Sequence, residues 1–272
     1  MKKLLSYLAM LALAVFLMAP FVWMVLVSLQ PNKAPIPTLD HVIPDHPAWS
    51  NYRLVLFDQP NLPVWRFFLN SAIVTFSVVV GQLLVSSLAA YGFARMQFKG
   101  RDWIFYVFLG SLMFSGPVTQ LPVYLLVRSL GWLDTYAALI VPGVSSAFTV
   151  FLLRQAFTAI PNELDEAARI DGAGDFRIYA RVVMPLSGAA LATSAAFSFF
   201  AVWTDFFWPL LSTNTSNMRT LEVGLSVFKT SYGSTNWPLQ MTATVIVMIP
   251  LLVGFLFSQR YFTKGIMIGS IK

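Results

Sequence analysis

The chain is poor in charged residues and contains no cysteine. Of its 272 residues only 11% are Asp, Glu, Lys or Arg, whereas 57% are hydrophobic. Water-soluble domains carry about 25% charged residues, so this chain has too little charge to cover a globular surface in water. It is also far too apolar for a disordered protein. The absence of cysteine excludes disulfides, thiol catalysis and cysteine-ligated metals.

Groups that carry catalysis or bind metal are also scarce. The only two histidines, His41 and His46, lie in one polar segment and make a poor metal site by themselves. The chain has no GxxxxGK[ST] phosphate-binding loop, no HExxH and no GxSxG. No nucleophile and base form a recognisable set. We therefore expect no catalytic residue, no metal site and no cofactor bound by this chain.

Long apolar runs are abundant. A membrane-spanning helix needs about 20 mostly apolar residues, and six segments fit: about Leu4–Leu29, Ser71–Ala94, Trp103–Val127, Tyr136–Leu153, Leu186–Leu211 and Thr242–Phe262. The first run follows Lys2 and Lys3, as in a secretory signal. It is longer than the roughly 7–15 residues of a signal's apolar region, however, and no small-residue cleavage site follows it. The sequence predicts an all-α membrane protein with six transmembrane helices, the first of them retained.

The basic residues predict the orientation of these helices. Cytoplasmic loops carry an excess of Lys and Arg. Of the 18 Lys and Arg residues, 12 fall on one side of the predicted spans and six on the other, namely Lys33, Arg53, Arg66, Arg128, Arg219 and Lys229. The richer side is expected to be cytoplasmic, which places both termini there. The net charge of +6 therefore indicates topology and not a nucleic-acid partner.

This topology divides the chain into four parts. Residues 1–29 form an N-terminal transmembrane helix, and residues 30–70 form an extracytoplasmic segment in which short helices are expected. Residues 71–262 form a core of five transmembrane helices, which includes a cytoplasmic loop at 154–185. Residues 263–272 form a cytoplasmic tail.

The loop at 154–185 is the longest polar break on the cytoplasmic side, and it begins with a predicted helix. Pro161 suits the first turn of a helix, where its missing N–H is not needed. Carboxylates favour the positive end of the helix dipole, and three follow in the first turns: Glu163, Asp165 and Glu166. Gly172 and Gly174 are expected to end this helix and turn the chain.

A second short helix is predicted over residues 176–183, with Asp175 as its cap and Pro185 at its end. Two interpretations of the loop remain open on physical grounds. Small side chains at Ala167 and Ala168, with charges of both signs around them, suit a helix that docks into a groove of another protein. The alternative is a helical hairpin that only connects two spans.

The loop resembles the EAA loop of ABC importer permeases. Glu166-Ala167-Ala168 is followed by Gly172 and then by Val182-x-Met184-Pro185. The family pattern is EAA, three residues, Gly, nine residues and Ile-x-Leu-Pro. Val and Met replace Ile and Leu with apolar residues of similar size.

Further stretches resemble the carbohydrate branch of these permeases, in particular the shorter subunit of the maltose and glycerol-phosphate type. The resemblance covers about Asn51 to the C-terminus. One of its motifs, Trp203–Leu210, has Thr204 where the family more often has Asn. The other stretches are Asn51-Tyr52, Phe68–Ser71, Ala89–Arg95, Leu121–Tyr124, Gly131–Thr135, Gln259–Phe262 and Lys264-Gly265.

The resemblance implies a type I ABC importer permease fold and a set of partners. These are a second homologous permease, a dimer of cytoplasmic ABC ATPases, an extracytoplasmic solute-binding protein and the lipid bilayer. The partner ATPase would bind ATP and Mg, and the chain would lie in a prokaryotic plasma (inner) membrane as a multi-pass protein. The coupling role in the ATPase cleft is carried over to Glu163, Glu166, Ala167, Ala168, Asp171, Gly172 and Ala173.

Polar and aromatic residues of the spans are candidates for a translocation path. Asp205 is the only acidic residue that the sequence places well within a span, and intramembrane ionisable groups are costly unless they have a role. It would line the path, or form a hydrogen-bonded contact with Asn70, a Ser or Thr, or a backbone amide. The other candidates, which could contact solute or simply pack helices, are Trp203, Phe207, Trp208, Asn70 and Tyr91.

The sequence leaves the solute open. A sugar or oligosaccharide is expected first, because the predicted spans contain no Lys or Arg to bind a phosphate. Glycerol-3-phosphate or another polyol derivative is the alternative within the same machinery. A stand-alone secondary transporter is a more distant alternative, since such proteins usually show inverted repeats and charged pairs within the membrane, and this chain shows neither.

Overall fold

The structure is a computed structural model that describes residues 2–35, 42–58, 62–232 and 236–268. Every regular element in these ranges is helical, which confirms the predicted all-α architecture. His41 and residues 269–272 of the predicted tail lie outside them. The elements are α1 (Lys2–Ser28), α2 (Ser50–Leu56), α3 (Val64–Arg95), α4 (Arg101–Gly110), η2 (Ser111–Met113), α5 (Gly116–Ser129), α6 (Tyr136–Ile140), η3 (Val141–Val144), α7 (Ala147–Thr158), α8 (Glu163–Ile170), α9 (Asp175–Ile178), η4 (Tyr179–Val183), α10 (Met184–Leu186), α11 (Gly188–Trp203), α12 (Phe207–Ser212), α13 (Leu221–Tyr232) and α14 (Trp237–Ile268).

Three single helices are long and apolar enough to cross a membrane: Lys3–Ser28, Val64–Arg95 and Trp237–Gln259. Three bent pairs raise the number of spans to as many as six if each pair counts as one. The pairs are Arg101–Met113 with Gly116–Ser129 (102°), Tyr136–Val144 with Ala147–Thr158 (40°) and Asp175–Leu186 with Gly188–Trp203 (79°). Each of the six predicted segments overlaps one of these helices or pairs.

The helices differ from the predicted spans at their ends. α3 already begins at Val64, and α7 continues to Thr158, so that Arg154 lies within a helix and not in a loop. Hydropathy marks the apolar part of a helix, whereas hydrogen bonding carries the helix on into its polar flanks. The long stem of an arginine can lie along the apolar surface there and keep its charged end in polar surroundings.

The prediction of one continuous fifth helix at Leu186–Leu211 is wrong. α10 ends at Leu186, α11 covers Gly188–Trp203, and α12 starts again at Phe207. Ser187 and Gly188 form a pair of the kind that commonly breaks or kinks helices. At the other break a short polar side chain offers the backbone a competing hydrogen-bond partner, as described below for Asp205.

By their contacts the residues group into two compact units, 1–69 with 219–250 and 70–218 with 251–272. In the first unit the buried side chain of Asn51 in α2 holds the end of α1. Its Nδ2 donates to the carbonyl oxygens of Ser28 at 2.9 Å and Gln30 at 2.8 Å, and Thr242 Oγ1 of α14 donates to Ser28 O at 3.1 Å. The last carbonyls of a helix lack partners within it, so these bonds complete the C-terminal end of α1.

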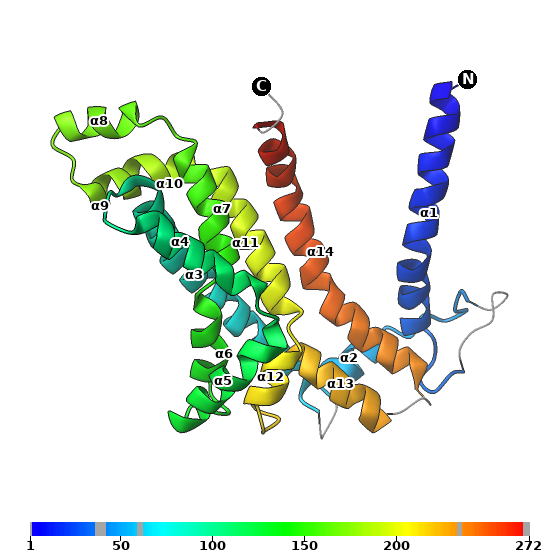
Figure 1. Cartoon of the computed structure of the whole chain (residues 1–272). Helices are drawn as coiled ribbons and strands as arrows, with labels where there is room; N and C mark the ends of the chain where they lie inside the picture. The colour runs from blue at the N-terminus through cyan, green and yellow to red at the C-terminus, as the bar shows by residue number, and fades with distance from the viewer. Residues whose placement is uncertain (1, 36–41, 59–61, 233–235, 269–272) are drawn as a thin grey trace. The chain divides into compact units, whose positions relative to one another are not determined.

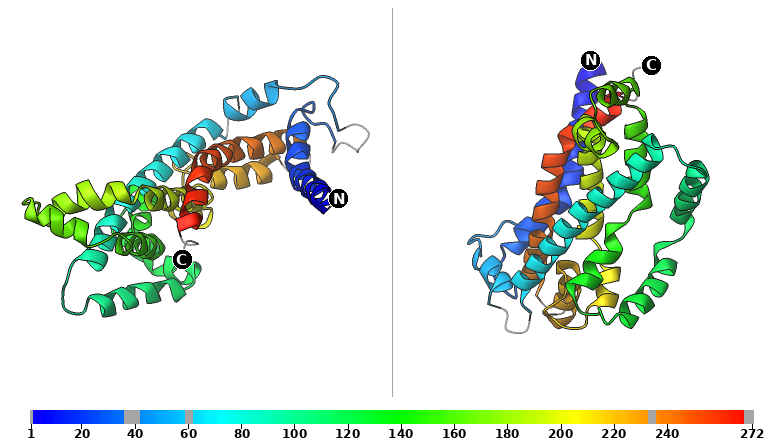
Figure 2. Two further views of the ribbon diagram at one scale, coloured as in Figure 1. Left: turned by 90° about the horizontal axis from the view of Figure 1, so that it is seen from above. Right: turned by 90° about the vertical axis from the view of Figure 1, so that its left-hand side faces the viewer.

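In the second unit an apolar cluster supports the loop that carries α8. We call it the loop cluster; its buried members are Ala90, Tyr91, Phe105, Val150, Leu153, Phe157, Ile178, Tyr179 and Val183. Figure 1 shows α8 at this end of the unit, beyond α7 and α9, with α5 and α6 at the opposite end. Both views in Figure 2 place α4 and α5 at one side of the unit. Apolar side chains along that bent pair, including Leu121 and Leu125, are exposed.

Candidate functional site

The predicted loop helix is α8, and a glycine ends it as expected. Its first turn carries the three predicted carboxylates, although the helix begins at Glu163 and leaves Pro161 outside. Gly172 has φ +79°, a left-handed conformation that side chains rarely adopt. The Gly172 N–H donates to Arg169 O at 3.0 Å and the Ala173 N–H to Ala168 O at 2.9 Å. These two bonds form a Schellman turn, which satisfies the last carbonyls of α8.

The second half of the loop differs from the prediction. Asp175 is the first residue of α9 and makes no capping hydrogen bond; it pairs instead with Arg169, Oδ1 to Nη2, at 2.8 Å. Pro185 does not end the helix, because the chain stays helical through η4 and α10 to Leu186. Pro185 falls in the first turn of α10, where a missing N–H costs least.

The seven residues assigned to coupling divide between two faces of the loop. Ala168 and Ala173 are partly buried and pack on the loop cluster. Five are exposed: Glu163, Glu166, Ala167, Asp171 and Gly172. The small side chains therefore differ in their surroundings. Ala168 and Ala173 let the loop lie close to the loop cluster, whereas Ala167 lies on the exposed side of α8.

Sequence reasoning missed three exposed apolar side chains on the same loop. Leu164 is 43% exposed, Ile170 87% and Phe176 74%. Apolar side chains in a segment of mixed charge were a usable signal, since a plain connector would carry polar residues at such positions. The exposed surface of the loop therefore carries these apolar side chains together with the carboxylates of Glu163, Glu166 and Asp171.

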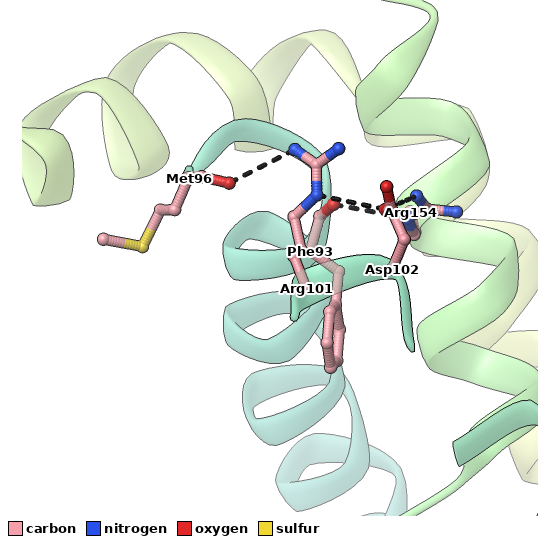
Figure 3. A network of polar contacts seen from close by, with 5 residues as sticks. All are labelled: Phe93, Met96, Arg101, Asp102 and Arg154. Carbon is pink, nitrogen blue, oxygen red and sulfur yellow. Dashed lines mark hydrogen bonds and ion pairs between the residues drawn. The ribbon is translucent and has the colours of Figure 1, made fainter. Parts of the chain in front are cut away.

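Arg101 and Arg154 bond to carbonyls at the C-terminal end of α3 (Figure 3). Arg154 of α7 donates from Nε to Phe93 O at 3.3 Å and from Nη2 to Asp102 Oδ1 at 3.3 Å. Arg101 donates from Nη1 to Met96 O at 3.3 Å and pairs through Nε with Asp102 at 3.1 Å. Phe93 lies in the last turn of α3, and Met96 is the residue after the helix. The carbonyl oxygens at a helix end have no partner within the helix, so these bonds satisfy them.

The predicted path residue Asp205 lies in the break between α11 and α12 and not inside a helix. Its Oδ1 accepts from the backbone N–H of Phe207 at 3.1 Å and of Trp208 at 3.3 Å. A carboxylate that receives two N–H groups at the start of a helix acts as a cap. Both bonds are local, and neither involves Asn70, which the sequence had offered as a partner.

The other predicted path residues are mostly packed in the second unit. Asn70 is fully buried; its Nδ2 donates to Asn217 O at 2.8 Å, and its Oδ1 accepts from Tyr136 Oη at 2.7 Å. Trp208 is buried and donates from Nε1 to Ala138 O at 2.9 Å.

Trp203 and Tyr91 are also buried. Trp203 stacks on Phe199 with ring centroids 5.8 Å apart, and Tyr91 meets Tyr179 edge-on at 5.4 Å within the loop cluster. Phe207 is exposed and lies next to the Asp205 cap. Asn70 and Tyr91 are 21 residues apart on α3, which corresponds to about 31 Å along a helix. The six residues therefore do not form one site.

The chain is helical, and its three long apolar helices and three bent pairs are those of a multi-pass membrane protein, with α8 in a loop outside them. Comparison with known proteins identifies the family. The chain belongs to the binding-protein-dependent transport system inner membrane components, whose family model matches residues 1–268. It is thus a permease of an ABC importer.

Relatives cover most of the chain. It is 35% identical to the arabinooligosaccharides transport system permease protein AraQ of Halalkalibacterium halodurans, over 80% of this chain and 78% of that one. It is 34% identical to the trehalose/maltose transport system permease protein MalG of Thermococcus litoralis, over 100% and 98%. It is 35% identical to the sn-glycerol-3-phosphate transport system permease protein UgpE of Brucella abortus, over 90% and 88%.

Solved structures share the fold. A bacterial ABC transporter involved in the import of the acidic polysaccharide alginate matches with a TM-score of 0.82 and 23% identity, over 96% of both chains. The predicted type I importer permease fold is therefore confirmed. A chain in a structure of the bacterial alginate transporter with a periplasmic protein that holds an alginate pentasaccharide matches with a TM-score of 0.59 and 13% identity, over 94% of this chain and 93% of that one.

Proposed function

We propose that this permease imports a sugar or oligosaccharide across a prokaryotic plasma (inner) membrane, and that α8 couples it to a separate ATPase. The observation that carries the proposal is the two-sided loop. Its inner face packs on the loop cluster, whereas its outer face presents carboxylates and the exposed side chains of Leu164, Ile170 and Phe176. An exposed apolar face on a compact helix favours a protein partner.

The proposed mechanism is a rigid-body switch. ATP and Mg bind to a dimer of the partner ATPase, whose closure moves α8 and the helices attached to it. A second, homologous permease completes the transmembrane pathway, and an extracytoplasmic binding protein delivers the solute. ATP shifts the equilibrium between inward-facing and outward-facing states because it binds one state more tightly.

Sugars are proposed as solutes because two of the named relatives transport arabinooligosaccharides and trehalose or maltose. A third transports sn-glycerol-3-phosphate, which keeps that solute as the second candidate. Among the predicted path residues, we assign contact with the path to the exposed Phe207, and we assign Asp205 to capping the start of α12 beside it. The buried Asn70, Tyr91, Trp203 and Trp208 are assigned to helix packing.

Reconstitution into liposomes tests this proposal. The chain, its partner permease, the ATPase and the binding protein are assembled, and uptake of labelled arabino-oligosaccharide, trehalose, maltose and glycerol-3-phosphate is measured with and without ATP. We expect ATP-dependent uptake of a sugar. Uptake without the ATPase would support a secondary transporter instead. Uptake of glycerol-3-phosphate and of none of the sugars would contradict the proposal that the solute is a sugar.

A pair of variants tests the docking surface. Ile170→Ser should reduce co-purification of the ATPase, because it removes an apolar side chain from the proposed contact. The matched control is Ile43→Ser, which changes a similarly exposed isoleucine in the segment 30–70. Equal ATPase binding by both variants would remove the outer face of α8 from the interface.

A further inference from the structure

A buried arginine connects α3 to the loop that carries α8. Arg95 is the last residue of α3, and its Nη2 donates to Ile160 O at 2.7 Å. Its Nη1 donates to Asn162 Oδ1 and lies 3.6 Å from Asp165 Oδ2. One guanidinium thus has three partners. They are the carbonyl oxygen of Ile160, the side chain of Asn162 just before α8, and the carboxylate of Asp165 in the first turn of α8.

This contact is buried, unlike the other ion pairs near the loop. The side chains of Arg95 and Asp165 are 3% and 13% exposed, whereas Arg169 and Asp175 are about half exposed. A planar guanidinium with five donors suits this multiple contact, which a lysine cannot reproduce fully. An exposed ion pair contributes little to stability. Removal of one partner of a buried pair is strongly destabilising, because it leaves a buried charge without compensation.

The pair is poorly optimised for stability. Arg95 Nε and Asp165 Oδ1 are buried without a hydrogen-bond partner among the described residues. A buried ion pair gains little net stability even when all its atoms are satisfied, and an incomplete network gains less. Stability alone therefore does not account for this contact, and its position at the start of α8 points to a role in placing the helix.

The helix that Arg95 ends is attached to other elements of its unit. Gln82, midway along α3, accepts from Ser198 Oγ of α11 and donates to Gly143 O in η3 at 3.4 Å. Asn70 binds Tyr136 and the carbonyl of Asn217. From Asn70 to Arg95, α3 is continuous over 26 residues, and the two ends lie about 37 Å apart at the rise of an α-helix. A displacement of its Arg95 end would therefore act on contacts far along the unit.

We propose that Arg95 is a positioning residue for coupling: through Ile160, Asn162 and Asp165 it makes α8 and α3 move together. This inference rests on the proposed function. Without the contact, α8 still docks on the ATPase through its outer face, but its displacement is absorbed by the loop residues on either side of it. Hydrolysis then continues while solute uptake falls.

The first experiment uses the complete chain without partners, in lipid nanodiscs. Amide hydrogen exchange over residues 163–170 is compared for wild type, Arg95→Gln, Asp165→Asn and the control Arg101→Gln. Arg101 lies at the same end of the unit but contacts Asp102 and Met96, not α8. We expect exchange to rise about tenfold or more in the first two variants and to be unchanged in the control. Unchanged exchange in both would overturn the proposal.

The second experiment measures ATP hydrolysed and solute taken up in the assembled importer. In Arg95→Gln we expect normal ATPase assembly and hydrolysis but about tenfold less uptake. Arg95→Lys should recover part of the uptake, because an ammonium can still bind Ile160 O and Asp165. The double variant Arg95→Gln/Asp165→Asn should transport no worse than the poorer single one, because both changes remove the same contact.

The outcomes separate this proposal from the function on which it rests. If wild type shows no ATPase-dependent uptake, both are overturned. If wild type transports and the ratio of uptake to hydrolysis stays normal in both single variants, only the role of Arg95 is overturned. Should Arg95→Gln fail to fold, Asp165→Asn carries the same test from the other partner. Multiplicative losses in the double variant would also contradict the proposal.

Discussion

At the residue scale, Gly172 and Gly174 stand two positions apart in the loop but have different backbones. Gly172 has φ +79°, whereas Gly174 has φ −79°, and neither has an atom near the position of an added Cβ. Gly172→Ala should destabilise the loop by about 1 kcal/mol, because a side chain disfavours the left-handed conformation. We expect solute uptake to fall, and we expect the helicity of α8, measured by amide hydrogen exchange, to fall as well.

Gly174→Ala is the matched control for this prediction, since its φ is open to every residue. It should leave exchange and uptake close to wild type. If both alanine variants behave alike, the left-handed turn is not what holds the end of α8.

Two variants of Asp205 test whether this residue acts as a helix cap or as a charged group that lines the translocation path. Asp205→Asn keeps an oxygen that accepts from the N–H groups of Phe207 and Trp208, so uptake and thermal stability should change little. Asp205→Ala removes the acceptor and should cost about 1 kcal/mol of stability. Thermal unfolding and solute uptake are measured for both variants. If Asp205→Asn loses transport but keeps a normal melting temperature, the charge itself acts on the solute.

Local chemistry explains which residue roles could be predicted. The stop at Gly172 follows from the glycine itself, and the acidic first turn of α8 follows from the helix dipole. The contact between Arg95 and Asp165 joins residues 70 positions apart, and no local pattern marks it. The same limit applies to Asn70 and Trp208, whose contact with the path stays a prediction. Their types suit solute contact, but their hydrogen bonds to distant backbone groups were invisible.

At the scale of elements, the apolar runs predicted where spans occur but not their shape. A run of hydrophobic residues shows that a segment is long enough for the membrane. It does not show direction, so the 102° bend between Met113 and Gly116 and the 79° bend at Ser187 were missed. The breaks have local causes, such as the Ser187-Gly188 pair, but a run of apolar residues does not reveal them.

Helix packing in the first unit gives a prediction at this scale. A Cβ on Gly224 of α13 would lie 2.6 Å from Cε2 and 2.8 Å from Cγ of Phe67, whose ring is fully buried. Gly224→Ala should therefore destabilise the chain by about 1–3 kcal/mol through overpacking. Thermal unfolding in detergent measures the effect, and Phe67→Leu in the Gly224→Ala background should restore part of the loss.

Gly92 provides the control, because it lies inside α3 with nothing within 4 Å of an added Cβ. Gly92→Ala should be neutral or stabilise the chain by about 0.5–1 kcal/mol, as alanine favours the helix. A similar loss of stability in both variants would show that the effect at position 224 comes from helix propensity and not from the Phe67 ring.

At the scale of the whole molecule, the chain keeps its folding contacts and its proposed partner contacts on different faces of one short helix. Asp165 and Ala168 face the rest of the chain, whereas Glu166 and Ala167 are exposed. A substitution on the outer face should affect only assembly, and one on the inner face should affect the permease itself. Adjacent residues therefore separate the two properties.

Ala167→Leu and Ala168→Leu add the same side chain at neighbouring positions of α8. Ala168→Leu should lower the melting temperature of the isolated chain, because the added atoms must enter the packed loop cluster, at a cost of about 1–3 kcal/mol. Ala167→Leu should leave that temperature unchanged, since its side chain points into solvent. It should instead weaken co-purification of the ATPase and reduce ATP-dependent uptake, because a bulky group holds the docking face away from its partner. Unimpaired assembly of Ala167→Leu would contradict close docking at this face, and a lower melting temperature in Ala167→Leu alone would contradict the assignment of the two faces.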